Sequence, residues 1–482
     1  MASIKGNIVL NGINTVTSIL FPIITFPYVS RILMPEGIGI INFQYSIINI
    51  ITFLTTLGIP TYAIKEIAKN RDDRILRDHI VFEIISLNAL MCLLGYVAVF
   101  LIASYVPEIH GNAVLFYVLS LSILFTAIGV EWFYKGIEDF KYITIRAIAV
   151  RVLSTVFLFV FVRKSSDLIA YGLVLVGSTV GNNLINFIHL RTIVNIKSVN
   201  FRKLKLLRHI KPALQMFVIG LIINFYGQLN PVMLGFLSDD TAVGFYTAGT
   251  KITYIGVMLI TSISPVLLPR CSHLLQKGET GAFRNVVEKS LRLTIAFSVP
   301  VMVGLTILSS YVVIIFCGND YLSSIPVLCF STPVVLLIGI SNVLGIQILF
   351  PQDRTNIVML SVFVGAVINV LLNILLIPRY AATGAALSTT VAEFGVLMTQ
   401  IIAGAKYFPF KWTNTHPLRY CFSSLLMVLP ILPAMLLIHN PVWCLIVSIL
   451  AGATVYFGVL IKFKDSLTLE TLHIILKKLH FK

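Results

Sequence analysis

Charged residues are scarce in this sequence: Asp, Glu, Lys and Arg make up 12% of its 482 residues, against about 25% in soluble globular proteins. Hydrophobic residues make up 57%. The sequence also lacks the GxxxxGK(S/T) loop that binds nucleotide phosphates and the HExxH motif that binds zinc. These absences argue against a soluble enzyme and against ATP-driven work by this chain. The composition predicts a protein that crosses a membrane many times.

Cysteine and acidic residues are also sparse. The six cysteines are scattered, mostly in apolar runs, at Cys92, Cys271, Cys317, Cys329, Cys421 and Cys444. They form no CxxC pair and no Cys/His ligand spacing, so we expect no disulfide, no metal and no cofactor. The 36 Lys and Arg against 20 Asp and Glu give a net charge of +16. In a soluble chain this excess would suggest a nucleic acid partner, but in a membrane protein basic residues collect in cytoplasmic loops.

The apolar runs are long enough to cross a membrane. A spanning helix needs roughly 20 mostly apolar residues, and the first run follows a segment that lacks an A-x-A-like cleavage site, which predicts a retained helix. The predicted spans cover, approximately, 8–30, 38–59, 79–104, 113–134, 142–162, 168–190, 213–237, 243–269, 289–316, 322–350, 355–377, 381–404, 418–438 and 441–461. We therefore predict an all-α integral membrane protein with about 14 transmembrane helices.

Basic residues between the spans predict the orientation. The loops after spans 2, 6 and 8 are rich in Lys and Arg, whereas the alternate loops hold only Arg31, Arg163, Lys164 and Arg379. Because basic loops stay in the cytoplasm, both termini and the basic linker at 191–212 are predicted to be cytoplasmic. Residues 462–482 are predicted to form a cytoplasmic amphipathic helix.

The sequence repeats itself weakly. Residues 27–39, PYVSRILMPEGIG, resemble residues 231–244, PVMLGFLSDDTAVG, and a second pair of segments matches at nearly the same offset. Spans 1–6 (residues 1–190) thus correspond to spans 7–12 (residues 213–404), and both have the same orientation because six is an even number. We predict two pseudosymmetric six-helix lobes around a central cavity, followed by two C-terminal helices within residues 405–461.

An ordered set of motifs resembles a known family. The segments are FPYVSRILMPEGIGIINF, GIPTYAIKEIAKNRDD, GVEWFYKGIEDFKYITIR and VGFYTAGTKI. Together they resemble the polysaccharide repeat-unit (Wzx-type) flippases of the multidrug/oligosaccharidyl-lipid/polysaccharide exporter superfamily. The resemblance implies two lobes in a V shape and movement of undecaprenyl-diphosphate-linked oligosaccharide from the cytoplasmic to the outer leaflet of the bacterial plasma membrane, for O-antigen or capsule assembly. It also implies membrane lipids and polysaccharide polymerase machinery as partners.

The resemblance implies ion coupling as well, with H+ or Na+ as the coupling ion, but the chain departs from the family at one point. Family members often carry an acid in span 7, in a pattern like LDKIMLG. This chain has LNPVMLG at 229–235, so Asn230 and Pro231 replace the acid and the base. The substitution argues against a cation site built on that carboxylate.

Two arginines lie in the apolar segment ITIRAIAVRVLST, residues 143–155. A charge near the bilayer centre costs about 2.5–3.5 kcal/mol on insertion scales. Arg146 lies roughly 6 Å and Arg151 roughly 13 Å into the fifth span. Three interpretations stay open: snorkelling to the headgroups for Arg146, a structural pair with Glu131 of the neighbouring span, or a cationic patch that binds the substrate diphosphate.

Other ionisable residues within the spans are further candidates. Lys251 and Arg31 would offer cations at the outer depth of the two lobes, unless Arg31 only marks a helix end and Lys251 makes a structural contact. Glu393 is either protonated against a polar neighbour or an ion-coupling site, and Glu131 is the second coupling candidate. Buried ionisable groups in membrane proteins usually face a cavity or the bundle interior.

Uncharged polar residues gather on spans 2 and 7. The candidates for contact with sugar hydroxyls are Asn42, Gln44, Asn224, Gln228 and Asn230. Hydrogen bonds between helices explain the same residues nearly as well.

The sequence therefore predicts a flippase for lipid-linked polysaccharide units. The alternatives are a lipid II flippase, a multidrug/cation antiporter of the same superfamily, and a membrane glycosyltransferase or polymerase. The last alternative would need catalytic acids or bases in a long outer loop, and no predicted outer loop is long.

Overall fold

The structure, a computed structural model, describes residues 4–195, 199, 204–262 and 264–470. Within these residues every regular element is helical. Contacts divide the chain into two compact units, Met1–Gly244 and Phe245–Lys482. The predicted lobes, residues 1–190 and 213–404, were inferred from the internal sequence repeat. The two units are defined by contacts instead, so the division into lobes stays a prediction.

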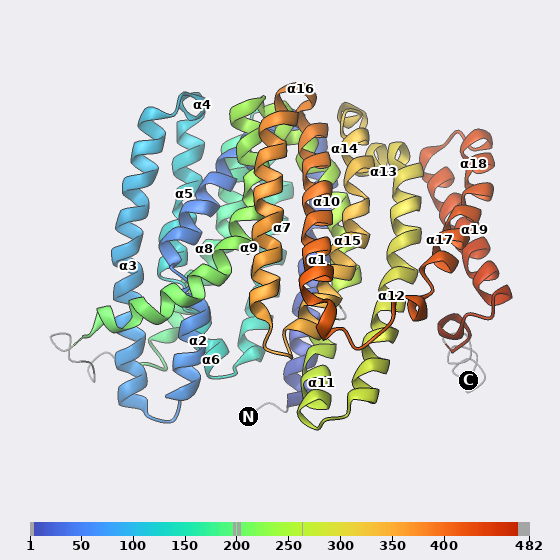
Figure 1. The fold of residues 1–482 in the computed structure, drawn as a ribbon. Coiled ribbons are helices and arrows are strands. Elements are labelled where there is room, and N and C mark those ends of the chain that lie inside the picture. The colour runs from blue at the N-terminus through green and yellow to red at the C-terminus, as the bar shows by residue number, and fades with distance from the viewer. Residues whose placement is uncertain (1–3, 196–198, 200–203, 263, 471–482) are drawn as a thin grey trace, which may run out of the picture. The chain divides into compact units, whose positions relative to one another are not determined.

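The first unit is a bundle in which long helices are joined by short ones (Figure 1). Its helices are α1 (Ile4–Thr56), α2 (Ile59–Lys69), α3 (Arg74–Tyr105), α4 (Pro107–His110), α5 (Ala113–Ala127), α6 (Glu131–Gly136), α7 (Phe140–Phe161), α8 (Leu168–Leu190), η3 (Leu206–His209) and α9 (Ile210–Leu237). Helix α5 packs on α8, α7 packs on both α1 and α8, and α2 packs on α6. The short helix α4 lies at one end of the unit, whereas α2 and α6 lie near the other (Figure 1).

Local sequence signals explain several helix ends in this unit. The Asp73 carboxylate accepts a hydrogen bond from the backbone N–H of Leu76 at 3.1 Å, and Asp139 does the same for Tyr142 at 3.2 Å. Both are N-caps, which occupy backbone N–H groups that the helix leaves unpaired. Asp139 therefore fixes the start of α7, the helix that carries both arginines of interest.

The second unit is also helical. It contains most of α10 (Asp240–Thr261), then α11 (Ser264–Gln276), α12 (Thr280–Ile307), α13 (Ser309–Phe316), η4 (Asn319–Tyr321), α14 (Ser324–Ser331), α15 (Pro333–Asn342), the π-helical segment η5 (Val343–Leu349), α16 (Thr355–Gly404), η6 (Ala405–Tyr407), η7 (Trp412–Thr415), α17 (Pro417–Leu426), α18 (Val428–Leu437) and α19 (Pro441–Lys462). Helix α16 packs on α14 and α15, and α12 packs on α15 and α17. The last helices, α18 and α19, pack on each other.

The predicted spans all fall on helices. Among the described residues, eleven helical stretches are long and apolar enough to cross a membrane. Two of these, Leu20–Lys69 and Thr355–Tyr407, each cover two predicted spans, and α9 covers the predicted span at 213–237. The chain is thus a multi-pass, all-α membrane protein, as predicted. Most of the predicted amphipathic tail, residues 471–482, lies outside the described part of the chain.

Candidate functional site

Arg146 is the centre of a polar cluster inside the first unit. Its Nη2 lies 3.0 Å from Oε2 of Glu131, and its Nε donates to Oδ1 of Asn182 at 3.1 Å. Glu131 is the first residue of α6 and also pairs with Lys135, at 2.8 Å. The side chain of Arg146 is only 4% exposed, against 38% for Glu131. One of the three interpretations, the structural pair with Glu131, is therefore observed, and its arginine is Arg146.

Aromatic side chains surround this cluster. The Arg146 guanidinium lies 5.7 Å from the centroid of the Tyr142 ring, a distance typical of cation–π contacts. Tyr142 in turn stacks on His189, with centroids 4.4 Å apart. The Tyr134 hydroxyl donates to the backbone carbonyl of Asn186 at 3.0 Å. These contacts hold Arg146 from three helices, α6, α7 and α8.

Arg146 keeps one donor unused. Among the described residues, its buried Nη1 has no hydrogen-bond partner. Arg146 also lines a cavity of about 520 Å³ together with Asp139, Lys141 and Tyr142. A buried donor without a partner is costly, but Nη1 has almost no accessible surface, so other atoms of Arg146 form its part of the cavity wall. Sequence analysis missed Asn182, because its place beside Arg146 depends on how α7 packs on α8. It also missed Lys141, which precedes Arg146 on the same helix.

Arg151 has a different environment. Its Nη1 donates to the Thr17 hydroxyl on α1 at 2.9 Å, and its side chain is partly buried. Five residues separate it from Arg146, which turns it roughly 140° around α7. Arg146 contacts α6 and α8, whereas Arg151 contacts α1, so these contacts do not gather the two arginines in one patch.

The remaining ionisable candidates are spread over both units. Arg31 is exposed, and its Nη1 lies 3.4 Å from the carbonyl of Pro27 in the same helix. Lys251 lies partly buried in α10, and Glu393 lies in α16 with 6% of its surface exposed. Both belong to the second unit. Their predicted roles in binding and coupling stay predictions.

The polar candidates on spans 2 and 7 have mixed environments. Asn42 donates to the carbonyl of Ile38 in its own helix at 2.7 Å. Gln44 is buried and lies 3.4 Å from the carbonyl of Asn112, just before α5. Asn230 is buried and Gln228 is partly buried, both in α9. The side chain of Asn224 lies outside the described part of the structure.

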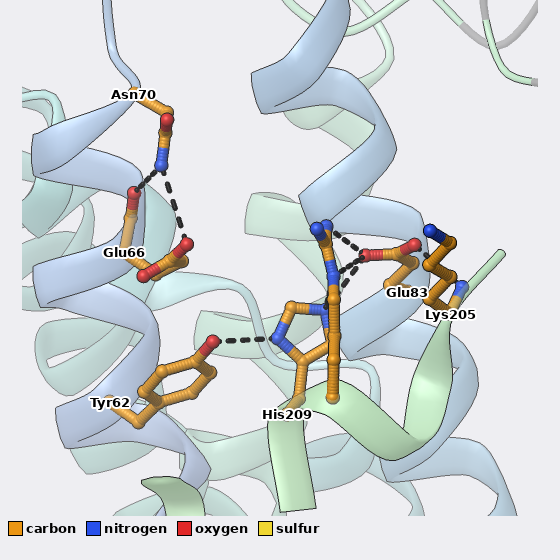
Figure 2. A network of polar contacts seen from close by, with 7 residues as sticks. Tyr62, Glu66, Asn70, Glu83, Lys205 and His209 are labelled. Atoms are coloured by element: carbon orange, nitrogen blue, oxygen red, sulfur yellow. Dashed lines mark hydrogen bonds and ion pairs between the residues drawn. The ribbon is translucent and has the colours of Figure 1, made fainter.

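A second polar network ties the basic linker to α2 and α3 (Figure 2). Glu83 of α3, 3% exposed, accepts hydrogen bonds from the backbone N–H of Lys205 at 2.7 Å and from Nε2 of His209 at 2.8 Å, and it pairs with Arg208. On the other side of the ring, Nδ1 of His209 lies 2.7 Å from the Tyr62 hydroxyl of α2. Burial lowers the pKa of His209, and the hydrogen bond to Glu83 offsets only part of this effect. Nδ1 of a neutral ring accepts from Tyr62 while Nε2 donates to Glu83.

The second unit has a comparable anchor at its C-terminal end. Asp465 is fully buried and lies 3.0 Å from Nη2 of Arg292 and 3.0 Å from the Tyr420 hydroxyl. Its other oxygen accepts from the backbone N–H of Thr468 at 3.1 Å. Burial alone would raise the pKa of the Asp465 carboxyl, but these hydrogen bonds and the Arg292 charge hold it below its ordinary value.

A protein-family model described as "Polysaccharide biosynthesis protein" matches residues 4–275 of the chain. The chain belongs to the polysaccharide biosynthesis protein family. A relative from Escherichia coli (strain K12), named "Putative O-antigen transporter", is 25% identical over 398 residues, which cover 81% of this chain and 94% of the relative. The lipid II flippase MurJ of Bacillus subtilis (strain 168) is 25% identical over 165 residues, 33% of this chain and 30% of MurJ.

Solved structures share the fold of this family member. The lipid II flippase MurJ in an inward closed conformation matches with a TM-score of 0.66 and 17% identity, over 93% of this chain and all of that chain. A multidrug resistance MATE family transporter of the MOP superfamily, in an inward-facing conformation, matches with a TM-score of 0.64 and 11% identity, over 80% and 93%. The comparisons confirm the predicted family and fold class.

Proposed function

We propose that this chain is a flippase that moves undecaprenyl-diphosphate-linked oligosaccharide repeat units from the inner to the outer leaflet of the bacterial plasma membrane for surface polysaccharide assembly. Membership of the polysaccharide biosynthesis protein family supports this proposal. The name of the Escherichia coli relative, "Putative O-antigen transporter", also supports it. The likeness in fold to a lipid II flippase and to a MATE transporter is further support, because both are membrane transporters and not soluble enzymes.

The observation that carries the site is the cavity that Lys141 and Arg146 line together. Two cations at one cavity suit a diphosphate, because charge-assisted hydrogen bonds to phosphate oxygens are strong. The same lining holds one carboxylate, that of Asp139. Two cations against one carboxylate make an antiporter for cationic drugs the weaker hypothesis.

Ion coupling is part of the proposal. Glu393 is 6% exposed, whereas the side chain of Glu131 is 38% exposed. Buried ionisable groups in membrane proteins often mark ion pathways, so we propose Glu393 as the site that couples transport to H+ or Na+. In proteoliposomes, an imposed ion gradient should accelerate transport by the wild-type protein and not by Glu393→Gln. Equal transport by the wild-type protein with and without a gradient would contradict coupling.

The flippase proposal is tested in cells that lack their own repeat-unit flippase. The wild-type chain should restore surface polysaccharide and lower the amount of lipid-linked repeat units that accumulate inside. Lys141→Gln should restore less polysaccharide at an equal protein level, because it removes one cation from the cavity. If the wild-type chain is made and inserted but restores nothing in a strain with the matching glycan, the proposal is wrong.

A further inference from the structure

We propose that a groove between α7 and α8 holds the apolar carrier chain of the lipid-linked substrate, with the diphosphate of the same molecule at Lys141 and Arg146. The identity of the ligand rests on the proposed function. The new element is the seat of the chain, and all residues that line it belong to the first unit.

The groove itself is apolar and open. Its volume is about 400 Å³, and large side chains line it from both helices: Leu153, Phe157 and Phe161 from α7 and Leu173 from α8. These side chains are 44–58% exposed. An open trough with such walls accepts an apolar chain by close packing, because lipid tails are as apolar as these side chains and removal from water contributes nothing within the bilayer.

The groove continues into the cationic cavity. Ile185 of α8 lines both of them. Along α7, the cavity ends at Ala149 and the groove begins at Val150. A cationic end and an apolar trough thus follow one another along a single helix. A cationic cavity followed by an apolar groove matches a molecule with an anionic head and a long apolar tail.

The charges at the cavity favour a diphosphate over the single phosphodiester of an ordinary phospholipid. Lys141 is exposed and lines the cavity together with Arg146. Asp139 lines the cavity as well, and one of its carboxylate oxygens caps α7 by accepting from the N–H of Tyr142. A head group with two phosphates can engage both cations, whereas a phosphodiester carries only one negative charge.

Glycine keeps the groove deep. A Cβ atom added at Gly177 would meet no atom within 4 Å, so the space above it is open. At Gly181, one turn further, an added Cβ would lie 3.2 Å from a methyl group of Val150, so the two helices are in close contact there. A large side chain at Gly177 would therefore fill the groove without colliding with the protein.

The groove lies in the half of the fifth span that is farther from Lys141. Residues 150–161 of α7 extend over roughly 17 Å, and half of the hydrocarbon core measures about 15 Å. The groove therefore seats a part of the chain that has passed the middle of the bilayer, and the carrier must be long enough to reach it from a diphosphate at Lys141.

The test compares two probes on the purified full-length chain, undecaprenyl diphosphate and inorganic diphosphate. Gly177→Phe fills the groove, and Gly458→Phe is its matched control, because Gly458 is also a helical glycine with open space around it. Gly177→Phe should weaken undecaprenyl diphosphate binding by roughly tenfold, about 1.4 kcal/mol, because the ring occupies the space in which the chain would pack. Binding of inorganic diphosphate should stay unchanged. Lys141→Gln should weaken the binding of both probes.

Three results would overturn the inference. One is equal undecaprenyl diphosphate binding by Gly177→Phe and Gly458→Phe. Another is equal loss of both probes in Gly177→Phe, which would indicate a damaged head-group site. The last is displacement of undecaprenyl diphosphate from the wild-type protein by equimolar phosphatidylglycerol, which would make the occupant a bilayer phospholipid. If binding behaves as expected but cells gain no surface polysaccharide, the groove stands and the proposed function fails.

Discussion

Arg146 and Arg151 lie on the same helix but have different partners, and this difference can be measured. Arg146 pairs with Glu131, whereas the Nη1 of Arg151 donates to Thr17. In double-mutant cycles with Glu131→Ala, Arg146→Ala should show a coupling of about 1 kcal/mol in thermal unfolding, a modest value because Glu131 is partly exposed. Arg151→Ala should show a smaller coupling in the same cycle, because the Glu131 charge also acts on Arg151 but Glu131 forms its ion pair with Arg146. Equal couplings for the two arginines would contradict the observed pairing.

The pKa of His209 predicts a pH-dependent attachment of the linker. The groups that face the ring are Glu83, Arg208, Tyr62 and the more distant Glu66, and burial lowers its pKa overall. Because the folded pKa lies below the ordinary value of about 6.5, the unfolded segment binds the proton more tightly. The attachment is therefore fully stable above about pH 6.5 and weakens as the pH falls.

Hydrogen exchange measures this effect directly. After correction for the intrinsic rate, protection of residues 204–210 should fall between pH 7.5 and pH 5, and His209→Gln should remove most of that pH dependence. The segment around Asp465 is the internal control, because a carboxyl with a lowered pKa stays ionised over this range. A linker segment whose protection is the same at both pH values would contradict the neutral state of His209.

At the scale of elements, α1 and α10 meet through two glycines at the same position of the internal repeat. A Cβ added at Gly39 would lie 1.6 Å from the carbonyl oxygen of Asp240, and one added at Gly244 would lie 1.9 Å from that of Pro35. Gly39→Ala and Gly244→Ala should each destabilise the protein by about 1–3 kcal/mol or more, because neither backbone can retreat without moving a helix.

Gly458→Ala is the control for this pair. It adds the same methyl group to a helix with open space around it, and alanine favours a helix more than glycine does. Its Tm in detergent should therefore equal or exceed that of the wild type, while the other two variants should show a lower Tm. If Gly39→Ala is as stable as Gly458→Ala, α1 and α10 are not in close backbone contact.

The elements also show what the sequence can and cannot predict. The length of the apolar segments alone predicted the spans, because the backbone N–H and C=O groups of each span must be hydrogen-bonded within its own helix. It did not predict how neighbouring spans are joined: α1 continues through a kink at Met34, with φ 61°, and α16 continues through one at Ala381, with φ 44°. The hydropathy of a segment cannot distinguish a kinked helix from two helices joined by a loop. Pro35 does indicate the break at Met34, because a residue before proline is disfavoured in the helical conformation.

The candidate site was predicted only in part for a similar reason. Arg146 and Glu131 were identified because a charged side chain within an apolar segment is costly to insert into a membrane, and such a segment is a local property of the sequence. Asn182, 36 residues away, and the cavity beside Lys141 depend on how α7 packs on α8, and no local pattern contains that information. The Glu83 network was missed in the same way, because its partners lie in a linker more than 120 residues later.

At the scale of the whole molecule, the uneven distribution of basic residues is the feature with the widest consequences. The sequence has 36 basic and 20 acidic residues, and the excess of basic residues is concentrated in alternate loops. It predicts on which side of the membrane the cationic cavity at the start of α7 opens, because α7 begins just after a predicted cytoplasmic turn. In this predicted orientation the cavity would receive the diphosphate from the cytoplasmic leaflet, where lipid-linked units are assembled in the proposed function.

Labelling of introduced cysteines tests this orientation. Lys277 lies exposed in a predicted cytoplasmic loop, and Tyr105 lies 78% exposed at a predicted outer end. In a background without the exposed Cys421, Tyr105→Cys should react in intact cells with a thiol reagent that cannot cross membranes. Lys277→Cys should react only with a permeant reagent or after the cells are opened. The opposite pattern would place the cationic cavity on the outer side, where it could receive the diphosphate only after transport and would serve release of the substrate instead of its capture.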